Sequence, residues 1–345
     1  MKYVLLGRSG LRVSELCLGS MTFGKEMGDF GADKDESQKI FDAFVAADGN
    51  FINSANRYML GGAEKMVGEF IAGDRDGFVI ATKYTMTTNP DDPNAAGNHR
   101  KNMMQAVAKS LERLNTSYID LLLIHAWDPA TPVMELMRGL DDLVKAGKVL
   151  YVGVSDTPAY VVAQANTIAE LRGWTPFIAY EIPYSLAQRT VEREMIPMAN
   201  DLGISVTPWS PLGAGVLTGK YSQETGETRR LNANNPRSQT WLTERNLSIA
   251  TEVERVAAEI GCTPAQVALS WVRQQPTKKP IIPILGARTE EQIIDNLGCL
   301  NVELSREQLD ALSEVSKIDM GFPREMFGRT DGNSFMWGNK FTPYS

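Results

Sequence analysis

The sequence has 345 residues and a formal net charge of −7, with 43% hydrophobic and 22% charged residues. This length suits two average domains or one large α/β barrel, and the acidic balance argues against a nucleic-acid-binding surface, because phosphate contacts need clustered Lys and Arg. The three scattered cysteines argue against a disulfide framework, and the short N-terminal apolar run and the lack of any membrane-length run make us expect a cytoplasmic protein.

Strand-like apolar runs alternate with helix-like periodic runs from one end of the chain to the other. A hairpin over residues 2–6 that turns at "GRSG" comes first. The apolar runs that predict strands are "ELCLGS", "NFIN", "FVIATK", "IDLLLIH", "KVLYVGVS", "FIAYE", "ISVTP" and "IIPILG". The predicted helices cover residues 35–47, 63–71, 98–114, 132–146, 158–172, 191–202, 264–274 and 290–297.

Repeated strand–helix units with near-continuous apolar strands predict an α/β fold, a (β/α)8 TIM barrel with an N-terminal β-hairpin. A doubly wound sheet is the rival, but it would place G-x-G-x-x-G after the first strand, and neither that pattern nor a G-x-x-x-x-G-K-[ST] loop occurs. We expect one domain over 1–345, with a long loop at about 213–245 and a tail at about 318–345 that either closes over the substrate or hangs free.

Polar side chains follow three consecutive predicted strands. Asn53 and Tyr58 follow the second, Lys83 ends the third, and His125 ends the fourth. Each alone could be structural, since Lys83 could be a solvated strand end and His125 a core histidine with satisfied hydrogen bonds. Active sites of (β/α)8 barrels form at the C-terminal ends of the strands. The three strand ends are therefore expected to converge on one pocket.

Several motifs, in order and spacing, give the chain a resemblance to the aldo-keto reductases over nearly its full length. They are "NFINSANRY", "FVIATKY", "LLLIHAWD", "GKVLYVGVSD", "TPWSPLGAGVLTGKY" and "PILGARTEEQIIDNL". The resemblance implies NAD(P)H-dependent reduction of aldehydes or ketones, with the cofactor extended across the barrel mouth and a small-molecule carbonyl as the partner.

The resemblance implies a role for each polar residue at the barrel mouth, and the chemistry agrees. Hydride delivery builds negative charge on the carbonyl oxygen, which needs a proton donor and fixed positive polarity. Tyr58 would be the general acid, and Lys83 would lower its ordinary pKa of about 10. Two charges ~4 Å apart at an effective dielectric of ~20 interact by roughly 4 kcal/mol, which lowers the pKa by about 3 at most. His125 would orient the carbonyl oxygen.

Two positions depart from the family pattern. Asn53 stands where the family has the aspartate that holds the lysine, so an acceptor for Lys83 remains but the countercharge is gone. Catalysis is therefore expected to be weakened or shifted in pH. Glu181 stands where a glutamine pairs with the nicotinamide carboxamide. Either Asn53 and Glu181 together retune the charge around the cofactor, or Glu181 faces solvent or a lysine.

The resemblance also assigns a set of cofactor-binding residues. Arg288 is suited to a 2′-phosphate, which points to NADPH, with NADH possible. Asn296 would read the adenine, Trp209 would stack on the nicotinamide, and the loop after it would cradle the pyrophosphate. The full set is Gly19, Met21, Thr22, Ser155, Asp156, Glu181, Trp209, Ser210, Pro211, Leu212, Gly213, Gly215, Thr218, Lys220, Gly286, Arg288, Gln292, Asp295 and Asn296.

Two other functions remain open at this point. The charge changes would also suit a lyase or epimerase that retains its cofactor and uses Tyr58 as a base. A nucleotide-binding regulatory protein like the potassium-channel beta subunits is the other, although it would have less need of Tyr58, Lys83 and His125. We expect no metal site, because His99 lacks further ligands. Aromatic and apolar residues beside the strand ends either line the substrate pocket or pack in the core: Met21, Phe23, Tyr84 and Trp127.

Overall fold

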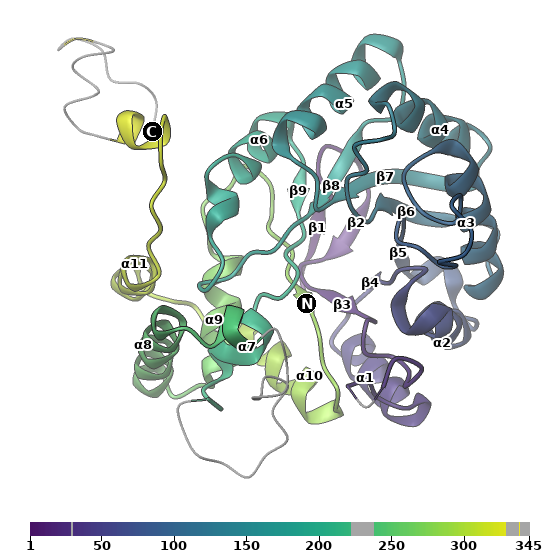
Figure 1. Cartoon of the computed structure of the whole chain (residues 1–345). Coiled ribbons are helices and arrows are strands. Elements are labelled where there is room, and N and C mark those ends of the chain that lie inside the picture. The colour runs from purple at the N-terminus through teal and green to yellow at the C-terminus, as the bar shows by residue number, and fades with distance from the viewer. Residues whose placement is uncertain (29, 222–237, 329–337, 339–345) are drawn as a thin grey trace.

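The computed structural model describes residues 1–28, 30–221, 238–328 and 338. Its centre is a parallel sheet that curls on itself (Figure 1). The strands follow the order β10-β3-β4-β5-β6-β7-β8-β9. These strands are β3 (Cys17–Gly19), β4 (Phe51–Asn53), β5 (Val79–Tyr84), β6 (Ile119–Ile124), β7 (Val149–Ser155), β8 (Phe177–Glu181), β9 (Ser205–Val206) and β10 (Ile284–Leu285). The predicted (β/α)8 barrel is confirmed.

Backbone hydrogen bonds close the barrel between β9 and β10, the two ends of this strand order. The amide of Ile282 donates to the carbonyl of Val206, and the amide of Ile284 donates to the carbonyl of Pro208, both at 2.9 Å. The last two strands are shorter than the apolar runs predicted. Proline has no N–H to give to a ladder, and Pro208 ends the first of these runs while Pro283 interrupts the second.

Helices surround the barrel, as Figure 1 shows. In chain order they are α1 (Lys34–Ala46), α2 (Gly62–Phe70), α3 (Arg100–Arg113), α4 (Val133–Lys145), α5 (Ala159–Arg172), α6 (Met195–Leu202), α7 (Ser238–Trp241), α8 (Glu244–Ile260), α9 (Pro264–Arg273), α10 (Glu290–Leu297), α11 (Arg306–Val315) and α12 (Arg324–Gly328). Their buried faces meet the outward-facing residues of the strands in one large apolar core. None of these helices is both long and apolar enough to cross a bilayer.

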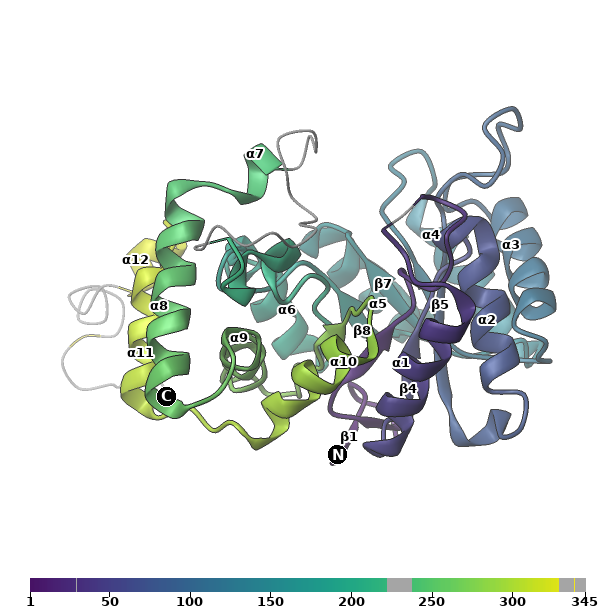
Figure 2. The same ribbon diagram turned by 90° about the horizontal axis from the view of Figure 1, so that it is seen from below.

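Helices α8 and α11 were not predicted from the sequence. They lie side by side on one flank of the barrel, and α8 also packs on α9 (Figure 2). The N-terminus of α8 is capped by Thr243, whose side chain accepts from the amide of Asn246. This cap was the signal available. Residues 222–237 of the predicted long loop and most of the predicted tail lie outside the described residues.

The inward-facing residues of the strands form a second, smaller core inside the barrel. Successive side chains of a strand point to opposite faces, so every second residue faces inward. Phe51 on β4, Val79 and Ala81 on β5, and Leu121 and Leu123 on β6 belong to this inner core. The next inward-facing position on each of these strands, two residues further along, is polar. These polar residues lie at the C-terminal mouth of the barrel, directly above the apolar inner core.

The predicted hairpin, β1 (Tyr3–Leu5) and β2 (Arg12–Ser14), is antiparallel and confirmed. Val13 on β2 and Leu6, directly after β1, join the inner core, so this hairpin covers one end of the barrel. Gly7 has a φ of 57°, its amide donates to Ser205 Oγ at 2.8 Å, and an added Cβ would collide with the carbonyl oxygen of Ile178.

Replacing Gly7 by alanine is expected to lower the free energy of unfolding by about 2–3 kcal/mol, because the left-handed backbone and the collision both oppose a Cβ. Gly10→Ala is the control, since a Cβ there has no neighbour within 4 Å. Urea denaturation of both variants measures the difference. Equal stabilities of the two variants would contradict this account of how the hairpin packs on the barrel.

Candidate active site

Three polar side chains on three strands meet at the C-terminal mouth of the barrel. Lys83 Nζ on β5 lies 2.6 Å from Asn53 Oδ1 on β4, 3.0 Å from the carbonyl oxygen of Ser54, and 3.2 Å from Glu181 Oε1 on β8. Lys83 is 0% exposed and Glu181 is 3% exposed. The Ser54 contact was not anticipated, since a main-chain acceptor leaves no mark in a sequence.

Tyr58 and His125 complete this group. Lys83 Nζ donates to the Tyr58 hydroxyl oxygen at 3.2 Å. The rings of Tyr58 and His125 meet edge to face, with centroids 5.6 Å apart. Tyr58 opens the 3₁₀ helix η1 (Tyr58–Gly61), where Met59 and Leu60 adopt positive φ. The sequence prediction that these strand ends lie together agrees with the geometry.

Burial and the neighbouring charges together set the pKa directions of Lys83 and Tyr58. Burial lowers the pKa of Lys83, but Glu181 and Tyr58 raise it, and the net result lies above the ordinary value. Burial raises the pKa of Tyr58, and the lowering by Lys83 does not offset it, so the net pKa also lies above its ordinary value. This direction is opposite to the lowering that the sequence suggested, because a phenolate loses its hydration at this site. Tyr58 therefore holds its proton at neutral pH.

His125 is neutral at this site. Burial, followed by the charge of Lys83, lowers its pKa to about 3. Its Nδ1 is buried and finds no hydrogen-bond partner in the described part of the chain. A neutral imidazole can donate one hydrogen bond but cannot supply a proton as an acid. The arrangement gives Tyr58 the acidic proton and leaves His125 suited to a hydrogen bond with a polar ligand atom.

The expected loss of the Lys83 countercharge did not occur. Glu181 supplies a carboxylate to Lys83 from the other side of the barrel mouth. Asn53 connects the two, because its Oδ1 accepts from Lys83 and its Nδ2 donates to Glu181 Oε2 at 2.8 Å. Glu181 therefore contacts a lysine, as the second interpretation of this residue expected.

Beyond this group, Asp156 and Trp209 face each other across the mouth. Trp209 Nε1 donates to Asp156 Oδ1 at 3.0 Å, and Asp156 adopts a φ of 40°. The surrounding protein desolvates the carboxyl and, with the charge of Glu181, raises its pKa to about 6, although the residue is exposed to solvent. Ser155, directly before it, is buried at the end of β7.

The loop after Trp209 has the backbone of an anion-binding nest. Positive φ occurs at Ser210 (51°), Gly213 (58°), Ala214 (56°) and Gly215 (94°). Leu212, with φ −96° and ψ 13°, precedes the left-handed Gly213, and such a pair is the conformation of a nest that attracts phosphate oxygens. The amides of Gly213 and Gly215 donate to the carbonyl oxygens of Ser210 and Leu212 within the same loop. An added Cβ on Gly215 would lie 3.1 Å from Lys220 Nζ, so a cation stands beside the loop. Pro211, Leu212 and Thr218, also predicted, belong to this segment, where the Thr218 hydroxyl donates to the carbonyl oxygen of Gly215.

A second group of the predicted cofactor residues lies on α10 and in the loop that precedes it. The amide of Arg288 donates to Gln292 Oε1, and Asn296 is buried with its Nδ2 3.4 Å from the carbonyl of Gly286. An added Cβ on Gly286 would meet nothing within 4 Å, so the space beside it is open. An extended anionic dinucleotide suits this surface, because it offers the nest, the cations of Lys220 and Arg288, and the open space beside Gly286.

Several predicted residues have structural partners instead. The Asp295 carboxylate accepts from Thr263 and Gln266, which cap α9. Gly19 packs against β10, where an added Cβ would lie 2.8 Å from a methyl group of Ile284. The Thr22 hydroxyl donates to the carbonyl oxygen of Ala287 at 2.6 Å, which joins the loops after β3 and β10, and Met21 beside it is half-buried.

The core alternative is correct for two of the proposed pocket residues. Phe23 and Tyr84 are buried in the outer core, whereas Trp127 is partly exposed.

His99 caps α3 through its Nδ1, which accepts from the amide of Asn102 at 3.3 Å. In the described residues no three His, Cys, Asp or Glu side chains are placed to hold a metal ion.

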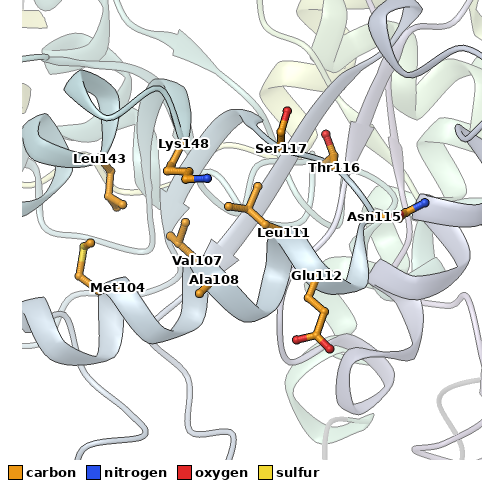
Figure 3. Close-up of a pocket in the computed structure, with 10 residues that line it drawn as sticks. All are labelled: Met104, Val107, Ala108, Leu111, Glu112, Asn115, Thr116, Ser117, Leu143 and Lys148. Carbon is orange, nitrogen blue, oxygen red and sulfur yellow. The ribbon is translucent and has the colours of Figure 1, made fainter.

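A cavity of about 750 Å³ lies away from this site, beside α3 and α4 (Figure 3). Its lining includes Ser117 and Lys148, which precede β6 and β7. It therefore opens at the N-terminal ends of the strands. Barrel enzymes place their chemistry at the opposite ends, where Lys83 and Glu181 are found.

Comparison with known proteins agrees with this geometry. Residues 15–317 match the model of the aldo/keto reductase family. The chain is 39% identical to an aryl-alcohol dehydrogenase [NADP(+)] of Phanerodontia chrysosporium, over 94% of this chain and 88% of that protein. It is 38% identical to a norsolorinic acid reductase of Emericella nidulans, over 93% of this chain and 82% of that protein. The chain belongs to the aldo/keto reductase family of oxidoreductases.

Proposed function

We propose that this protein reduces an aldehyde or ketone to an alcohol with NADPH as the hydride donor. The observation that carries the proposal is the contact of Lys83 with Tyr58 at the barrel mouth, beside the half-buried His125. Because the Tyr58 oxygen accepts from Lys83, its own O–H is left to donate to a carbonyl oxygen. Tyr58 is the general acid, and its raised pKa keeps the proton in place at neutral pH.

His125 and Lys83 support the same step electrostatically. The neutral His125 donates a hydrogen bond that fixes the carbonyl oxygen, and the ammonium of Lys83 stabilises the negative charge that develops there and on Tyr58. When bound, the reduced nicotinamide supplies the hydride. Ser155, Asp156 and Trp209 would hold its carboxamide and ring.

The remainder of the cofactor would lie across the two regions described above. The nest of residues 210–215 and the cation of Lys220 would bind the pyrophosphate. Arg288 at the N-terminus of α10 would bind the 2′-phosphate, and Asn296 would contact the adenine.

The proposal is tested by following NADPH absorbance with a panel of carbonyl compounds. Aryl aldehydes come first, because one relative is named an aryl-alcohol dehydrogenase. We expect NADPH consumption, and we expect Arg288→Ala to lower the preference for NADPH over NADH by about 10-fold or more, since a charge-assisted contact contributes about 1.5–3 kcal/mol.

Leu171→Ala, an exposed change on α5, serves as the control variant. No consumption of either nucleotide with any carbonyl would reject the proposed reaction. An unchanged preference in Arg288→Ala would reject only the assignment of the 2′-phosphate site.

A further inference from the structure

The buried ammonium of Lys83 has one carboxylate partner among the described residues, and it comes from a distant strand. Glu181 ends β8, whereas Lys83 and Asn53 lie on the neighbouring strands β5 and β4. Both members of this ion pair are almost fully removed from water. A buried charge without a partner is costly, so Glu181 is necessary for a charged Lys83.

Asn53 is chemically matched to this carboxylate. Its amide carries an acceptor, which faces Lys83 at 2.6 Å, and a donor, which faces Glu181 at 2.8 Å. The reversed amide would place NH2 against an ammonium and an oxygen against a carboxylate, so the orientation is fixed by its partners. An ionised aspartate at position 53 could not donate, and it would place two carboxylates in direct contact.

We propose that Glu181, held by Asn53, is the anion that positions Lys83 in this enzyme. The resemblance leads one to expect an aspartate at position 53 and a glutamine at position 181. Here the amide stands at position 53 and the carboxylate at position 181, so the net charge of the group is the same. Asn53 then does not mark an inactivated site. Glu181 is a positioning residue that acts on the reaction through Lys83. The catalytic consequence rests on the proposed function, but the contacts themselves do not.

The other titratable groups that face this cluster leave a clear readout in the alkaline range. His125 and Asp156 have pKa values of about 3 and about 6, and burial raises the pKa of Cys17 well above its ordinary value. A change in the alkaline limb of the rate profile therefore reports on Lys83 and Tyr58.

The test is a charge-exchange series of Asn53→Asp, Glu181→Gln and the double variant, each measured for Tm and for kcat against pH. For Glu181→Gln we expect a Tm loss of about 6 °C or more, because one partner of a buried pair is removed. We also expect the alkaline limb to move to lower pH, since burial lowers the pKa of Lys83 and only Tyr58 would then oppose it.

Asn53→Asp alone is expected to lower Tm, and the loss should grow as pH rises from about 5 to 8. At low pH one of the two carboxyls keeps a proton and still donates to the other, whereas at high pH both are charged and repel. The double variant should regain most of the lost Tm and the original alkaline limb, because one amide and one carboxylate again face Lys83.

Glu64→Gln is the matched control. The Glu64 side chain is 0% exposed, and its Oε2 lies 2.6 Å from Nε of Arg113 on α3, outside the barrel mouth. It should lower Tm without moving the rate profile, and Asn53→Asp should not rescue it. Additive Tm losses in the double variant, or a gain in Tm and kcat from Asn53→Asp alone, would overturn the inference. If no carbonyl is reduced by any form, the Tm series still decides it, so its failure is separable from that of the proposed function.

Discussion

Replacing Tyr58 by phenylalanine is expected to lower kcat by about 10²–10⁴-fold, the usual contribution of a positioned general acid. The change removes the hydroxyl that accepts from Lys83 at 3.2 Å and that would protonate the carbonyl oxygen. NADPH affinity should change little, because the proposed nucleotide contacts lie on other loops. Steady-state kinetics with an aryl aldehyde and fluorescence titration of NADPH measure the two quantities.

Tyr84→Phe is the control for this prediction. The Tyr84 hydroxyl donates outside the barrel to the carbonyl oxygen of Asn98 at 3.1 Å, so its loss should affect stability more than kcat. If Tyr58→Phe kept a kcat near that of the unaltered enzyme, the proton would have to come from another group or from water. The assignment of Tyr58 would then be wrong.

Replacing Lys83 by methionine is expected to damage both rate and stability. The stability loss should be about 3–5 kcal/mol, because the Glu181 carboxylate would remain buried without its cation. The rate should fall by about 10²–10³-fold or more, since one fixed positive group beside the developing oxyanion is removed. Urea denaturation and kcat at neutral pH check the two effects.

Lys278→Met is the matched comparison for the stability effect. Lys278 pairs with Asp201 at 3.3 Å, but the two side chains are 70% and 78% exposed. Exposed pairs contribute little, so this change should cost less than about 1 kcal/mol. Equal losses in the two variants would mean that the Lys83–Glu181 pair is not buried in solution as the structure has it.

The sequence determined the barrel and the strand ends at which its candidate active-site residues lie. Local rules were sufficient, because the period of two in each strand and the polar residue at its end are visible in runs such as "FVIATK". They did not predict the lengths of β9 and β10, where Pro208 and Pro283 remove donors, nor did they reveal α8. The residues that would form the nest came only from resemblance.

The tertiary structure decided which charges meet. Glu181 lies far from Asn53 and Lys83 in the sequence, and only the curvature and register of the closed sheet bring β8 to face β4 and β5. It also decided the pKa of Tyr58, since the depth of burial is a property of the whole mouth and outweighs the neighbouring Lys83. The order of the strands follows from local patterns. The contact of Glu181 with Lys83 and the loss of hydration at Tyr58 depend on how all the strands and loops pack together, and no single segment of the sequence determines that.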